Sequence, residues 1–81
     1  MDLPLSALVR GQRAYIESVD DSTGMERRLG ELGLLPGTQL VCELVSPGGD
    51  PVAYRVRGTL IALRRRDARA VRVHLCGEEG V

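Results

Sequence analysis

The chain has 81 residues, a formal net charge of zero, 11 basic residues that are all arginine, and two cysteines. Its length allows one domain, and zero net charge argues against a dedicated nucleic-acid binder. Two cysteines are too few for the disulfide framework of a small secreted protein, and no apolar run approaches the roughly 20 residues of a membrane-spanning helix. We therefore expect a cytoplasmic protein with two free thiols, which meets a membrane only through a partner.

The N-terminal third predicts two short strands and one helix. Pro4 cannot donate to an interior ladder, so residues 3–5 are expected to form an edge strand. Aromatic and β-branched residues gather in residues 14–19, which predicts a second strand. The turn-forming residues 20–24 end this strand. A helix over residues 24–32 should follow.

The predicted helix has one apolar face and a marked end. Met25, Leu29 and Leu32 are spaced i, i+4, i+7. Gly33 suits the left-handed residue that closes a Schellman motif, and Leu34 would supply the hydrophobic contact of that motif. So short a helix must dock on the rest of the domain to be stable.

The remaining sequence alternates with the period of two that is typical of strands. Residues 39–45 predict a strand with Leu40, Cys42 and Leu44 on one face, and residues 52–63 predict a ribbon that bends at Gly58 as a bulge or corner. Residues 64–68 should be a polar turn, with one 3₁₀ turn as the alternative, and residues 70–75 should be the last strand. The expected fold is all-β, a small barrel of five to six strands with one short inserted α-helix. It would occupy residues 1–76, followed by a flexible tail at 77–81.

Catalysis is not expected. The single histidine, His74, is predicted on the solvent face of the last strand, and no glycine-rich phosphate loop follows a strand. Metal binding is considered separately from catalysis. His74 and Cys76 are two residues apart, so on a strand their side chains would point to the same face. They could hold Fe²⁺ or Zn²⁺ weakly, with no cofactor required; the alternative is an exposed imidazole and thiol with no metal role.

The run Arg64–Arg66, with Arg69 and Arg72 nearby, is the strongest charge feature. It could bind phosphate or face a partner, although most such runs are simply solvated. Only Tyr15 and Tyr54 could stack on bases, so binding of RNA or DNA ranks last among the functions considered.

Several segments together resemble the FeoA family over residues 3–75. They are Arg28–Thr38, which contains Leu-Gly-Leu-Leu-Pro-Gly-Thr, then Pro47–Pro51 with Gly-Asp-Pro, then Gly58 and Ile61–Arg64. The resemblance implies an SH3-like barrel and a cytoplasmic accessory role in bacterial ferrous iron uptake. It also implies a partner, the membrane transporter FeoB, through its cytoplasmic GTP-binding region. A similar domain ends the iron-dependent repressors of the DtxR type, so a metal-responsive module is the alternative.

A docking surface for such a partner is predicted around the end of the helix, where apolar side chains exceed what a small barrel can bury. Its members are Leu32, Leu34, Leu35 and Leu60, rimmed by Arg27 and Arg28. The alternative is that Leu29, Leu32 and Leu34 merely close one end of the barrel. Self-association through the edge strand at Pro4 is also open.

Overall fold

One antiparallel sheet dominates the computed structural model, which describes residues 2–20 and 24–76. The predicted tail at 77–81 lies outside these residues. The strands occur in the order β1-β6-β2-β3-β4-β5 across the sheet. Their bounds are β1 (Asp2–Pro4), β2 (Arg13–Val19), β3 (Gln39–Val45), β4 (Val52–Val56), β5 (Thr59–Leu63) and β6 (Val71–Leu75). Three short helical segments connect them, η1 (Leu5–Ala7), α1 (Met25–Glu31) and α2 (Arg65–Ala68).

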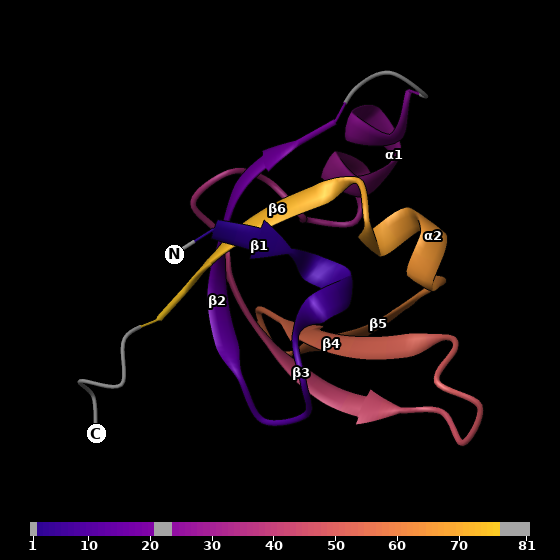
Figure 1. Cartoon of the computed structure of the whole chain (residues 1–81). Helices are drawn as coiled ribbons and strands as arrows, with labels where there is room; N and C mark the ends of the chain where they lie inside the picture. The colour runs from indigo at the N-terminus through magenta and orange to yellow at the C-terminus, as the bar shows by residue number, and fades with distance from the viewer. Residues whose placement is uncertain (1, 21–23, 77–81) are drawn as a thin grey trace.

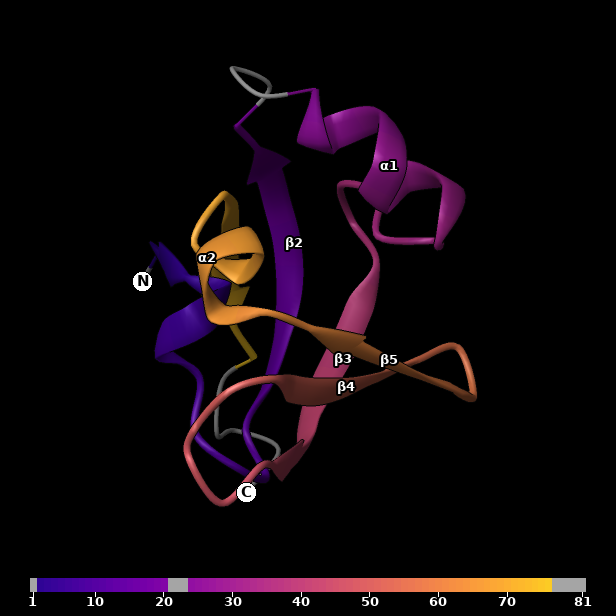
Figure 2. The same ribbon diagram turned by 90° about the vertical axis from the view of Figure 1, so that its right-hand side faces the viewer.

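The sheet curls around a single core, as Figures 1 and 2 show, but β1 and β5 remain at its two edges. The prediction of a small, all-β fold with a short inserted helix is therefore confirmed, with an open sheet instead of a closed barrel. The predicted edge strand at Pro4 is β1, which pairs with β6 alone. None of the helices in the described part of the chain is long and apolar enough to cross a membrane.

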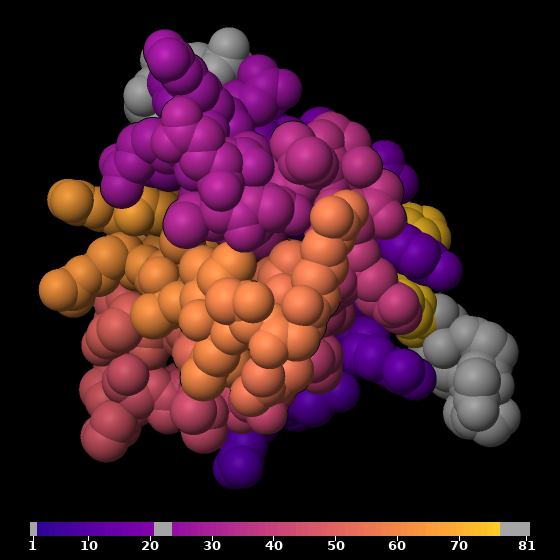
Figure 3. All heavy atoms as spheres, turned by 180° about the vertical axis from the view of Figure 1, so that it is seen from behind, coloured from indigo at the N-terminus to yellow at the C-terminus, as the bar shows by residue number. Residues whose placement is uncertain are grey.

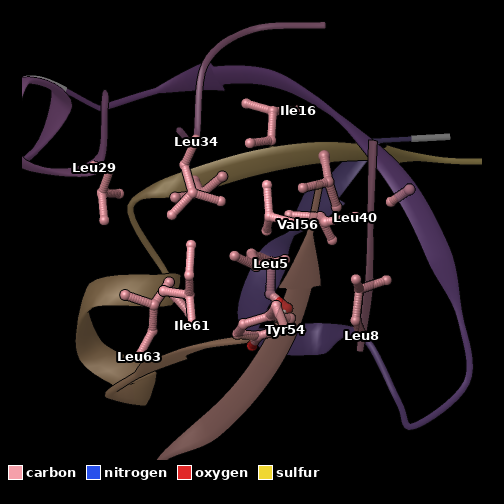
Figure 4. Close-up of a cluster of buried hydrophobic side chains, with 14 of the residues drawn as sticks. Leu5, Leu8, Ile16, Leu29, Leu34, Leu40, Tyr54, Val56, Ile61 and Leu63 are labelled. Atoms are coloured by element: carbon pink, nitrogen blue, oxygen red, sulfur yellow. Dashed lines mark hydrogen bonds between the residues drawn. The ribbon is translucent and has the colours of Figure 1, made fainter. Parts of the chain in front are cut away.

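The core collects the inward-facing side chains of the sheet together with one face of α1. In Figure 4, Tyr54 of β4 lies beside Leu5, and Leu29 and Leu34 join the cluster from α1 and the turn that follows. The largest fully buried side chains are Tyr54, Leu5, Ile16, Leu29, Leu34, Val71, Val73 and Cys42. Burying apolar side chains of this size contributes about 1.5–3 kcal/mol each, and it is the main stabilising term of so small a domain.

Two predictions about the strands are wrong, and both failures have a local cause. Leu44 does not share the inward face of Leu40 and Cys42, because the pairing of β3 with β4 shifts between Cys42 and Leu44 and turns Leu44 outward. Gly58 is not a bulge in a continuous ribbon. Arg57 and Gly58 both have positive φ, 53° and 82°, which makes them the two-residue turn of a hairpin between β4 and β5.

A third difference concerns residues 65–68, where a polar turn was expected and α2 is found. The helix lacks a side-chain cap from its own N-cap residue, Arg64. Instead the Asp50 carboxylate, from the loop before β4, accepts a hydrogen bond from the Arg65 backbone N–H at 2.9 Å. The carboxylate thus satisfies a donor that the helix cannot satisfy itself.

Candidate functional site

The end of α1 is shaped by the Schellman motif that the sequence predicts. Gly33 has φ of 95°, the Gly33 N–H donates to Gly30 at 3.0 Å, and the Leu34 N–H donates to Leu29 at 2.9 Å. The motif turns Leu34 back onto the helix, where its side chain packs beside Leu29 in the core (Figure 4). Leu34 is 1% exposed, so its predicted place on an exposed docking surface is wrong.

The other three predicted leucines are exposed. Leu32 closes α1 and is 50% exposed, Leu35 in the following turn is 46% exposed, and Leu60 on the edge strand β5 is 42% exposed. The contact of large apolar side chains with water is unfavourable, and a partner that covers these side chains removes this free-energy cost. We call Leu32, Leu35 and Leu60 the leucine patch.

The position of Leu35 depends on two glycines. Pro36 and Gly37 form a tight turn in which the Thr38 N–H donates to Leu35 at 2.9 Å, with Gly37 at φ of 88°. This turn lays Leu35 over α1, where a Cβ added at Gly30 would lie 3.2 Å from Leu35 Cδ2. Gly30 therefore leaves room for Leu35, which explains a glycine inside a helix.

Figure 3 shows α1 and the turn after it, in purple to magenta, beside β5 and α2, in orange, on one face of the molecule. Arg27 and Arg28 lie on α1. Arg27 reaches Glu31 at 3.9 Å, and both side chains are so exposed that the pair contributes little to stability. Arg28 instead lines a hollow between α1 and α2.

Arginine side chains line two adjoining hollows at α2. One of about 510 Å³ includes Arg28 and Asp20 in its lining, the other of about 450 Å³ is lined by Arg64 and Asp50, and both share Arg66 and Arg69. The described residues provide no ion pair for Arg28, Arg64, Arg66 or Arg69. These guanidinium groups are free to meet carboxylates of another molecule.

The middle arginine of the run has a different role. Arg65 donates from Nε to the Gly49 carbonyl at 2.7 Å and from Nη1 to the Ser6 carbonyl at 2.9 Å. It therefore ties the loop before β4 to η1. Of the three consecutive arginines, Arg65 therefore stabilises the fold, whereas the side chains of Arg64 and Arg66 are exposed.

The structure groups His74 with acidic residues and not with Cys76. His74 Nδ1 lies 3.1 Å from Asp2 Oδ1 and 4.0 Å from Glu17 Oε2, and the three side chains form a cluster with the spacing of metal ligands. Cys76 is not part of this cluster, and its Sγ accepts a hydrogen bond from Gln39 Nε2 at 3.2 Å. The structure thus groups His74 with Asp2 and Glu17, and the metal role predicted for His74 and Cys76 stays a prediction. The sequence analysis missed Asp2 and Glu17.

The buried titratable groups belong to the core. Burial raises the pKa of the Cys42 thiol, although Arg65 and Arg10 act against the shift, and burial raises the pKa of Tyr54 to about 12. Tyr54 donates a long hydrogen bond of 3.5 Å to the Leu5 carbonyl. A neutral thiol and a neutral phenol in an apolar setting are poor nucleophiles and bases.

Residues 3–75 match the family defined as the FeoA domain. This chain belongs to the FeoA family. It is 34% identical over 71 residues to the Fe(2+) transport protein A/Fe(2+) transporter FeoB fusion protein of Porphyromonas gingivalis. The match covers 88% of this chain and 8% of the fusion protein, so the chain spans a small part of that relative.

Solved FeoA structures share the fold. The solution structure of FeoA from Chlorobium tepidum is 36% identical with a TM-score of 0.85, and the match covers 93% of this chain and 71% of that one. The crystal structure of Stenotrophomonas maltophilia FeoA complexed with zinc, described as a prokaryotic SH3 domain protein, is 35% identical with a TM-score of 0.77 and 88% coverage of both chains. The crystal structure of T. acidophilum IdeR matches at 25% identity and a TM-score of 0.81, over 93% of this chain and 34% of IdeR. The SH3-like fold that the resemblance implied is thereby confirmed.

Proposed function

We propose that this chain is a cytoplasmic accessory protein of bacterial ferrous iron uptake, which acts without catalysis by binding the cytoplasmic GTP-binding region of the transporter FeoB. One observation carries the proposal. A relative 34% identical to this chain is a single polypeptide that joins an iron transport protein A to the transporter FeoB. Fusion of two proteins keeps them at high effective concentration, as expected for partners that work in contact.

The leucine patch is the proposed contact surface. Leu32 and Leu35 come from the end of α1 and the turn after it, and Leu60 comes from β5, so one partner surface could cover all three. Apolar anchors of this kind provide most of the binding free energy when a partner excludes water from them. Arg27 and Arg28 form the polar rim of the patch.

The arginine-lined hollows suggest which charged groups border the contact surface of the partner. Arg66 and Arg69 line both hollows and have no ion pair among residues 2–20 and 24–76. We therefore expect an apolar partner surface bordered by carboxylates. Such charge complementarity raises the association rate and makes it sensitive to salt.

Binding to the purified GTP-binding region of FeoB from the same organism tests the proposal, with calorimetric titration in the nucleotide-free, GDP and GTP-analogue states. The expected result is one-to-one binding in at least one state, with weaker binding at higher salt. Iron uptake by a strain that lacks the chain, complemented with Leu32→Glu, links binding to transport and should remain deficient. Absence of binding in all three states would contradict the proposal.

A further inference from the structure

Three neighbouring strands bring one imidazole and two carboxylates together on the outer face of the sheet, far along the strand order from β5. Asp2 lies on β1, His74 on β6 and Glu17 on β2, with β6 between the other two. Asp2 is paired directly with His74, so their side chains share a face.

Glu17 lies on the same outer face because it follows the buried Ile16 in the regular alternation of β2. Tyr15, the other outward residue beside Ile16, pairs with His74. Ile16 pairs with Val73 and Ser18 pairs with Arg72, which leaves Glu17 as an extra residue between two consecutive positions of β6. Its Oε2 lies 4.0 Å from His74 Nδ1.

The distances among the three groups suit a shared ion. His74 Nδ1 lies 3.1 Å from Asp2 Oδ1 and 4.0 Å from Glu17 Oε2, and one ligand atom of each residue lies within 4.8 Å of the others. Ligand atoms bound at roughly 2.0–2.2 Å to one ion lie about 3.0–3.6 Å apart, so small side-chain rotations would complete the geometry.

We propose that Asp2, Glu17 and His74 bind a divalent transition-metal ion. One nitrogen and two carboxylate oxygens suit Zn²⁺, Fe²⁺ or Mn²⁺ better than Mg²⁺, which prefers oxygen ligands in an octahedral arrangement. Two carboxylates facing one neutral imidazole also carry two negative charges, which a divalent cation neutralises. Three protein ligands leave positions on the ion for water or for a ligand from another molecule.

The ion would join the edge strand β1 to β6 and β2. Among the described strands β1 pairs with β6 alone, so a bound ion adds a connection that the unfolded chain does not have. The proposed site shares no residue with the leucine patch, so it stands or falls independently of the proposed function.

Calorimetric titration of the full chain with Zn²⁺ tests the proposal, together with its melting temperature at increasing Zn²⁺. The expected result is one-to-one binding that raises the melting temperature, at least tenfold weaker in Asp2→Asn, Glu17→Gln and His74→Gln. Mg²⁺ at the same concentration should have no effect, and Fe²⁺ added without oxygen should compete with Zn²⁺.

Two matched controls decide between this ligand set and others. Glu26→Gln removes an exposed carboxylate on α1, and Cys76→Ser removes the thiol two residues after His74; both should bind Zn²⁺ as the unchanged chain does. Loss of binding in Cys76→Ser, or equal binding in Glu17→Gln, would overturn the proposal. Absence of any binding would show that the three side chains form a surface ion pair only.

Discussion

The guanidinium of Arg65 donates a hydrogen bond of 2.9 Å to the backbone carbonyl of Ser6, 59 residues earlier in the chain. A second donor of the same side chain reaches the Gly49 carbonyl at 2.7 Å. One half-buried arginine thus joins η1, the loop before β4 and α2, three segments that the ladder of the sheet does not connect.

Replacing Arg65 should therefore destabilise the protein, while replacing its neighbour should not. Arg65→Ala removes two charge-assisted hydrogen bonds and leaves two partly buried carbonyl groups without a donor, a loss of about 2 kcal/mol in the free energy of unfolding. Arg64→Ala, at an exposed side chain, should change it by less than about 0.5 kcal/mol. Urea denaturation measures both, and equal stability of the two variants would contradict this role for Arg65.

Stability should fall in strongly alkaline solution because of Tyr54. Burial raises its pKa from 10.0 to about 12, so the folded protein holds the phenol proton more tightly than the unfolded chain does. The resulting stability is complete below pH 10 and is lost as the pH rises toward 12, by at most about 1.4 kcal/mol per pH unit.

Urea denaturation between about pH 9 and pH 11 measures this slope. Tyr54→Phe keeps the ring in the core and should make the slope shallower. Tyr15→Phe, at a half-exposed tyrosine, is the matched control. A slope unchanged by Tyr54→Phe would show that the phenol does not contribute. The Cys42 thiol, whose pKa burial also raises, should account for part of the slope that remains.

The two cysteines should differ in reactivity. Cys42 is fully buried and its pKa is raised, so little thiolate forms and no reagent reaches it without opening of the core. Cys76 is only partly buried, just beyond the end of β6. One thiol per chain should react quickly with Ellman's reagent under native conditions and the second only after denaturation. Fast reaction that persists in Cys76→Ser would contradict the assignment.

Gly30→Ala separates helix stability from the shape of the leucine patch. Alanine favours the helix over glycine by about 1 kcal/mol, but its Cβ would lie 3.2 Å from Leu35 Cδ2 and must displace that exposed side chain. We expect a protein at least as stable as the original in thermal denaturation that binds the transporter less tightly. A variant that binds with unchanged affinity would show that the position of Leu35 does not matter.

Much of the fold follows from local patterns in the sequence. The alternation of residues 39–45 correctly predicts β3, and Gly33 correctly predicts how α1 ends. That same motif carries Leu34 inward, so the rule that predicts the helix end also argues against Leu34 as a docking residue.

The differences between prediction and structure arise where a residue depends on a distant strand. Whether Leu44 faces inward or outward depends on a shift in its pairing with β4, which no local pattern reveals. Likewise α2 receives its first hydrogen-bond acceptor from Asp50, which lies 15 residues before Arg65. The candidate metal cluster was missed for the same reason, because Asp2 and Glu17 meet His74 only in the folded sheet.

The most direct test of the proposed function compares two leucines of equal exposure. Leu32, 50% exposed, belongs to the leucine patch, and Leu44, 49% exposed, lies toward the opposite end of β3 from α1 (Figure 1). In calorimetric titrations with the GTP-binding region of FeoB, we predict that Leu32→Glu weakens binding at least tenfold and that Leu44→Glu leaves it unchanged. Equal affinities of the two variants, or loss of binding in Leu44→Glu alone, would contradict docking through the leucine patch.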